Sequence, residues 1–129
     1  MTHGTDTQVH DLHHPLILAS RVVGTPVFDR SGTRLGHVAD VSIDKASGKT
    51  IYAIMSFGGF LGIGEKFHPV PWVLLDYDLE REGFTVPLAP DTLKDAPNYE
   101  MRDLREVGGA DFRVHGDVIY GYYGAVPYW

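Results

Sequence analysis

The segment Thr50–Phe57, "TIYAIMSF", constrains the fold more than any other feature of the sequence. It is rich in β-branched and aromatic residues, which favour a strand. Its apolar side chains occupy both phases of that strand: Ile51, Ala53, Met55 and Phe57 in one phase, and Tyr52 and Ile54 in the other. Because successive side chains of a strand point to opposite faces, the segment predicts a strand that is covered on both sides.

Further short strands are predicted around this segment. "TPVFD" and "RLGHVADVSID" flank the turn "DRSGT". In the second of these strands small or apolar residues alternate with polar ones, which predicts one buried face containing Leu35, Ala39, Val41 and Ile43. "KFHPVPW" and "EGFTVPLA" read as extended segments, whereas helix is limited to a turn after Ser20 and to "PDTLKDAP", with Asp91 as its N-cap. The prediction is a mostly β chain, a small antiparallel β-barrel with one or two short helices.

The chain divides into three parts by composition. At 129 residues it has the length of one domain. Residues 1–14 are polar and histidine-rich and are predicted to be a mobile tail, and residues 15–99 hold the predicted barrel. Residues 100–129 begin charged and end aromatic, and they are predicted to form an extended C-terminal arm. The aromatic residues of this arm are Tyr120, Tyr122, Tyr123, Tyr128 and Trp129.

Charge and composition exclude several classes of function. The formal net charge is -6 and no basic stripe is present, so nucleic acid is not an expected partner. Without cysteine the chain has no thiolate nucleophile and no cysteine-ligated metal. No apolar run reaches the roughly 18 residues of a membrane-spanning helix, and the N-terminus lacks a basic region followed by a hydrophobic segment. We therefore expect no membrane span and a cytoplasmic location.

The glycine-rich stretch "FGGFLGIGEKFHPVPW", Phe57–Trp72, resembles a phosphate-binding loop only superficially. Gly64 is followed by Glu65 before Lys66, whereas a phosphate loop needs lysine directly after its last glycine and then a helix. The prolines that follow oppose such a helix. We interpret the stretch as a connection between strands, with an apolar patch of Phe60, Leu61 and Ile63 that a partner or the chain's own arm covers.

Metal or ligand binding is the alternative that the residues leave open. His10, His13 and His14 would share one face of a helix and hold a transition metal, although a solvated tail is the simpler interpretation. Asp40 and Asp44 are expected on one face of a strand, where a carboxylate pair suits Ca²⁺ or acid–base chemistry. No G-x-S-x-G or H-E-x-x-H motif is present, so we predict neither a catalytic residue nor a cofactor.

From roughly Leu16 to Tyr99 the chain resembles the PRC-barrel domain family. The resemblance rests on "RVVGTPVFDRSGTRLGHVADVSID", on "YAIMSFGGFLGIGEKFHPVPW" and on the closing "LKDAPNY". The residues that match the family's loop and strand are Gly58, Gly59, Gly62, Gly64, Pro71 and Trp72. The resemblance implies a small β-barrel with a role in binding or assembly, and it brings no catalytic residues with it.

Two functional hypotheses follow. The first is a non-enzymatic interaction module that forms a homodimer and binds an unidentified protein, through the Phe60–Ile63 patch and the aromatic arm. The second is a small-ligand or metal-binding protein that uses the histidines and strand carboxylates. By family analogy alone, docking at a photosynthetic or respiratory membrane complex is a further alternative, which the negative charge of the chain disfavours.

Overall fold

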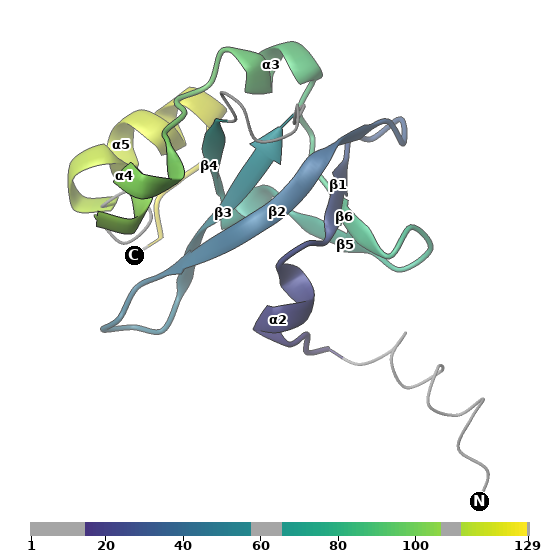
Figure 1. The fold of residues 1–129 in the computed structure, drawn as a ribbon, viewed down its shortest axis with the longest axis horizontal. Coiled ribbons are helices and arrows are strands. Elements are labelled where there is room, and N and C mark those ends of the chain that lie inside the picture. The colour runs from purple at the N-terminus through teal and green to yellow at the C-terminus, as the bar shows by residue number, and fades with distance from the viewer. Residues whose placement is uncertain (1–14, 58–65, 107–111, 129) are drawn as a thin grey trace, which may run out of the picture.

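A computed structural model describes residues 15–57, 66–106 and 112–128 of the chain. These residues form one sheet and several short helices (Figure 1). The strands are β1 (Pro26–Phe28), β2 (Arg34–Ile43), β3 (Thr50–Phe57), β4 (Phe67–Pro71), β5 (Asp76–Asp78) and β6 (Gly83–Thr85). The helices are α2 (Ala19–Val22), the 3-10 turn η1 (Trp72–Leu74), α3 (Pro90–Lys94), α4 (Met101–Glu106) and α5 (Phe112–Tyr123).

The sheet is mostly antiparallel, with the strand order β4-β3-β2-β1-β6-β5. Only β1 and β6 pair in parallel among the described strands. The prediction of a mostly β chain with antiparallel pairing is therefore confirmed.

The predicted closure into a barrel is wrong for the described strands. β4 and β5 are the two edges of the sheet, and η1 connects them where a closing ladder would lie. Two residues of β4, Pro69 and Pro71, have no amide hydrogen to donate, so β4 is suited to be an edge strand. Besides its ladder with β3, β4 makes one isolated antiparallel bridge, between Phe67 and Tyr99, among the described residues.

Strand β3 is covered on both faces, as its two apolar phases predict. Every side chain from Ile51 to Ser56 is buried. The first core lies on one face and includes Val27, Val38, Ala53, Met55, Val70, Phe84 and Leu93. The second core lies on the other face and consists of Ile51, Tyr52, Ile54, Leu104, Ile119 and Tyr120.

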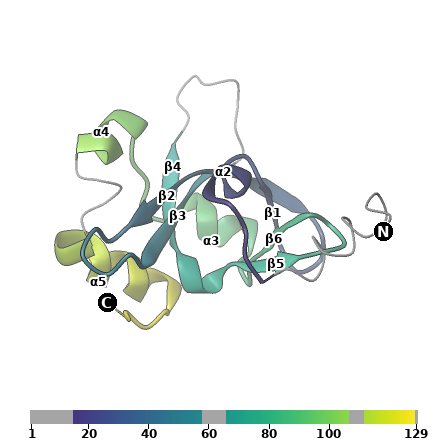
Figure 2. The ribbon, with the colours of Figure 1, turned by 90° about the horizontal axis from the view of Figure 1, so that it is seen from below.

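The C-terminal part is helical, so the prediction of an extended arm is wrong. In α5, Gly116, Ile119, Tyr120 and Tyr123 recur at helical spacing and turn toward the sheet. The helix ends at Gly124, whose φ of 70° suits glycine, and the amide of Ala125 donates to the carbonyl of Tyr120 over 2.9 Å. Helices α4 and α5 gather beside β3 and β4, at the opposite end of the molecule from β5 and β6 (Figure 2).

A β-bulge corrects the predicted faces of β2. Val38 pairs with Met55 and Asp40 pairs with Ile54, so Ala39 is an extra residue that shifts the alternation. As a result Val38 is fully buried in place of Ala39. Val41 stays on the side of the first core as predicted, whereas Ile43, also predicted to be inside, is the last residue of β2 and is 50% exposed.

Helix α3 also begins two positions earlier than predicted. Ala89 is its N-cap and Pro90 occupies the first helical position, where a missing amide hydrogen costs nothing. Asp91 therefore lies within the first turn.

Candidate functional site

Several residues singled out by the sequence lie outside the described part of the chain. They are His10, His13, His14, Gly58, Gly59, Phe60, Leu61, Gly62, Ile63, Gly64 and Trp129. Their roles in metal binding, in the loop or in a contact patch stay predictions.

The two described residues of the family signature have structural positions. Pro71 is buried at the end of β4. Trp72 is half-buried at the start of η1, and its ring packs edge-on against Phe84 at 5.7 Å between centroids. Both residues support the turn between the two edge strands.

Tyr120 is the centre of the contact between α5 and the sheet. Its side chain is fully buried, with its ring edge-on to Tyr52 at 5.7 Å. Its hydroxyl group donates a 2.7 Å hydrogen bond to the carbonyl of Ile51. Burial, and then the nearby Tyr128, raise the pKa of Tyr120, so the hydroxyl stays a donor. Tyr120 was predicted as a contact residue for a partner, yet in this structure it contacts the chain's own sheet.

Tyr128 and Lys49 extend this contact beyond the end of the helix. The hydroxyl group of Tyr128 donates to the carbonyl of Thr50. Lys49 donates to the main-chain carbonyl of Tyr128 over 3.1 Å, with its ammonium 5.7 Å from the centre of the Tyr128 ring. Thr50 and Ile51 therefore each receive one tyrosine hydroxyl from the C-terminal segment.

Tyr122 and Tyr123 lie on different sides of α5. The hydroxyl group of Tyr122 donates over 2.6 Å to the carbonyl of Thr92 in α3, and the residue is 41% exposed. Tyr123 packs against both cores, and burial raises the pKa of its hydroxyl.

The outer side of α5 and the residues that follow it form an apolar, exposed surface, here called the outer face. It consists of Val118, 64% exposed, Tyr122, and Val126, 79% exposed. Gly121 lies between them, and a Cβ atom added there would meet nothing within 4 Å. No residue from Val118 to Tyr128 is charged. An uncharged apolar face of this kind is unusual on a helix that also buries its opposite side.

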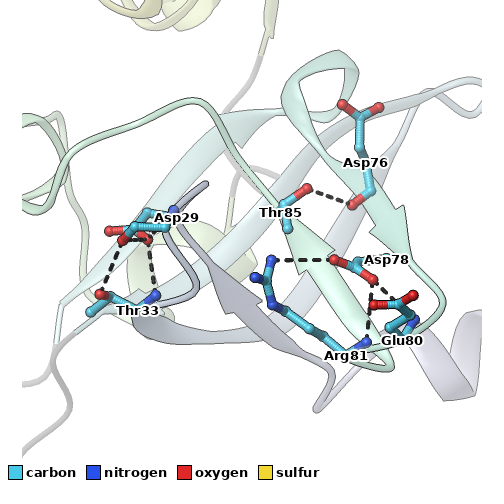
Figure 3. A network of polar contacts seen from close by, with 8 residues as sticks. Asp29, Thr33, Asp76, Asp78, Glu80, Arg81 and Thr85 are labelled. Carbon is cyan, nitrogen blue, oxygen red and sulfur yellow. Dashed lines mark hydrogen bonds and ion pairs between the residues drawn. The ribbon is translucent and has the colours of Figure 1, made fainter.

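The polar residues of the two hairpin ends form local turns, as Figure 3 shows. Asp29 accepts hydrogen bonds from the amides of Ser31 and Thr33, both 2.9 Å long. The Ser31 hydroxyl, and then the Thr33 amide, lower the pKa of the Asp29 carboxyl. These are the hydrogen bonds of an Asx turn, so the position of the Asp29 carboxylate is explained by the turn itself and requires no bound ligand.

The second hairpin is built in the same way. Asp78 accepts from the amides of Glu80 and Arg81 and pairs with the Arg81 side chain at 3.2 Å (Figure 3). Arg81 also packs over Gly32, where a Cβ atom would come within 3.0 Å of its guanidinium. The two sets of hydrogen bonds are separate, and the side chain of Arg81 joins the two hairpin ends by packing against Gly32 and Phe28, which is a structural role.

The carboxylate pair expected on β2 does not form. Asp44 follows the end of β2, and its oxygens accept from the Ala46 amide and the Ser47 hydroxyl within the turn. Asp40 accepts from the amide of Val41. Within the described ranges, no group of three His, Asp or Glu residues is arranged to hold a metal ion.

His68 is a buried histidine on the face of the sheet that carries the first core. Its ring stands edge-on to Phe57 at 5.9 Å, and its Nδ1 atom is buried without a hydrogen-bond partner. Burial lowers the pKa of His68, because the apolar surroundings disfavour the imidazolium.

The sequence does not predict the carbonyl groups that accept the tyrosine hydrogen bonds, nor the lysine that contacts Tyr128. The carbonyls of Thr50 and Ile51 have no signal in the sequence, because every residue has a main-chain carbonyl. Lys49 lies in the turn "KASGK" and gives no sign of its contact with Tyr128. In the described part of the chain, the helices are all too short or too polar to cross a membrane.

Comparison with known families gives one match. The model of the PRC-barrel domain matches residues 14–93, which is more than half of the chain. The comparison with curated proteins yields no match. The matched range contains the whole sheet and ends within α3, so α4 and α5 lie beyond it.

Proposed function

The chain belongs to the PRC-barrel domain family, and from this premise we propose that it is a non-enzymatic protein-interaction module that associates with a second copy of itself. The family match supports a small domain of the protein-interaction type. Self-association and the surface that performs it are the parts of the proposal that require an experiment.

The observation that carries the proposal is the outer face of α5. Val118, Tyr122 and Val126 remain exposed although the other side of the same helix is already buried on the sheet. Exposed apolar and aromatic side chains are typical of the centre of a protein interface. Covering this face would remove apolar surface from water, which is the main favourable contribution to association.

Charge favours a second copy as the partner at this face. The chain carries a net charge of -6, so two copies repel each other over most of their surfaces. From Val118 to Tyr128 the outer face has no charged residue, and the exposed Asp117 lies just before it, so two copies can meet there with less repulsion than over the rest of their surfaces. A two-fold axis would place the same side chains on both sides of the contact.

The absence of native cysteine allows a direct test. The variant Val118→Cys has a single thiol on the outer face, and mild oxidation is expected to convert it to a covalent dimer at micromolar concentration. The matched control is Leu79→Cys, since Leu79 is an apolar residue with 44% exposure on the hairpin at the other end of the molecule. Non-reducing electrophoresis measures both.

The proposal predicts that Val118→Cys cross-links at least tenfold faster than Leu79→Cys. Equal rates for the two variants would reject the outer face as the contact between copies. The patch of Phe60, Leu61 and Ile63 is proposed as a second contact, to be tested in the same way with Leu61→Cys.

A further inference from the structure

The second core is assembled from two different parts of the chain. Ile51, Tyr52, Ile54 and Phe67 come from β3 and β4, within the range that matches the family. The side chains that cover them, including Leu104, Ile119 and Tyr120, come from beyond that range. We call the first group the helix-binding face, because α5 lies against it (Figure 1).

The polar contacts of α5 and of the segment that follows it with β3 use main-chain acceptors. Tyr120 donates to the carbonyl of Ile51, and Tyr128 donates to the carbonyl of Thr50. Ile51 is the extra residue of a bulge, since Ser42 pairs with Tyr52 and Ile43 pairs with Thr50. Because of the bulge, Ile51 pairs with no residue of β2. Its carbonyl instead accepts a hydrogen bond from the hydroxyl group of Tyr120. Any helix with a tyrosine at the position of Tyr120 could donate the same hydrogen bond to the carbonyl of Ile51.

The contact contains few charges. None of the ion pairs found among the described residues includes a residue of α5. The charged group that reaches the segment is Lys49, and it binds a main-chain carbonyl of Tyr128. The fit therefore depends on apolar shape and on hydroxyl groups, so it does not require the particular charges of this chain.

A helix of the length of α5 is marginally stable on its own in water. Once α5 leaves the sheet it is expected to lose its helical structure, so docking and folding of this segment are coupled. The chain connection keeps α5 near the face at a high effective concentration, on the order of millimolar, so an external helix must compete with it.

We propose that the helix-binding face is a binding site for amphipathic helices, and that α5 is its built-in, displaceable occupant. The partner is an uncharged amphipathic helix with apolar residues at the positions of Ile119 and Tyr123 and a tyrosine at the position of Tyr120. Binding of that helix displaces α5. The proposal concerns the inner side of α5, so it is independent of self-association through the outer face.

Hydrogen exchange on the wild-type chain gives the first test, and it needs no variant. If α5 is displaceable, its amides exchange through a local opening while β3 stays folded. The amides of α5 are then expected to exchange at least tenfold faster than the most protected amides of β3. Equal protection of α5 and β3 would mean that the helix leaves only when the whole sheet unfolds, which would overturn the proposal.

Binding of a peptide in trans gives the second test. The probe is a fluorescent peptide with the sequence of residues 112–129, added to the full chain carrying Ile119→Ser and Tyr120→Phe, which weaken the docking of its own α5. The peptide is expected to bind this variant at least tenfold more tightly than the wild type, as measured by fluorescence anisotropy. The full chain with Val118→Ala, altered only on the outer face, should behave as the wild type does.

A control peptide with Ile119→Asp should not bind either chain. The circular dichroism spectrum shows whether the variant chain keeps its sheet. A folded variant that binds the peptide no more tightly than the wild type would overturn the proposal, and if the variant unfolds, the hydrogen-exchange result decides.

Discussion

At the residue scale, tyrosine hydroxyl groups fix the C-terminal segment on the sheet. Tyr120 and Tyr128 donate to the consecutive carbonyls of Ile51 and Thr50. A buried carbonyl without a donor costs about 1–3 kcal/mol, so the two tyrosines contribute more than apolar packing alone. The aromatic end of the sequence therefore has a structural role, and only Tyr122 of the described tyrosines in this segment is well exposed.

His68 gives a prediction about pH at the same scale. Its pKa in the folded chain lies below the ordinary value of 6.5, because its ring is buried. Between the lowered pKa and 6.5 the unfolded chain binds more protons at this residue than the folded chain does, so stability decreases as the pH falls. The contribution is fully retained above pH 6.5, is lost as the pH falls toward the lowered pKa, and is constant below that pKa.

The measurement compares urea unfolding of the wild type with that of His68→Leu between pH 8 and pH 4. The free energy of unfolding of the wild type should decrease more steeply below about pH 6.5 than that of the variant. Other groups titrate in both chains, so the difference between the curves isolates His68. Parallel curves would show that His68 takes up a proton equally in both states.

At the scale of the elements, β2 and β3 lie so close together at Gly36 that no side chain fits. A Cβ atom at position 36 would lie 1.9 Å from the main-chain oxygen of Ser56. We predict that Gly36→Ala lowers the free energy of unfolding by about 3 kcal/mol or more, because backbone must move to make room. Arg34→Ala, an exposed change on the same strand, should alter it by no more than about 0.5 kcal/mol. Chemical denaturation measures both, and a small effect of Gly36→Ala would contradict this packing of the two strands.

The elements also show which parts of the fold are readable from the sequence. The double coverage of β3 follows from the apolar residues in both of its phases, and the structure confirms it. The bulge at Ala39 has no sequence signal, so the alternation predicts Ala39 inside where the structure buries Val38. Ile43, also predicted inside, is the last residue of β2 and is exposed.

Helix α5 was missed because its residues argue weakly for a helix. Gly116, Gly121 and several aromatic residues have low helix propensity, and packing against β3 overrides that preference. The part of the site that involves Tyr120 and Tyr128 was anticipated as aromatic contact, but its acceptors, the carbonyls of Thr50 and Ile51, cannot be predicted from side-chain types.

At the scale of the whole molecule, the family domain and the C-terminal helices make one folded unit with two contact surfaces. The inner side of α5 completes the second core, and its outer face stays exposed. The open sheet differs from the closed barrel that the resemblance implied, because β4 contains two prolines and passes directly into η1. The proposed role in interaction therefore depends on α5 more than on the sheet itself.

Sedimentation equilibrium of the full chain tests the central proposal of self-association most directly. We predict that the wild type has twice the mass of one chain at micromolar concentration. The double variant Val118→Lys and Val126→Lys should have the mass of a single chain, because the added charges on the outer face would face each other across the two-fold axis, while Leu79→Lys should remain a dimer. A wild-type chain with the mass of a monomer up to millimolar concentration, or a double variant that remains a dimer, would contradict the proposal.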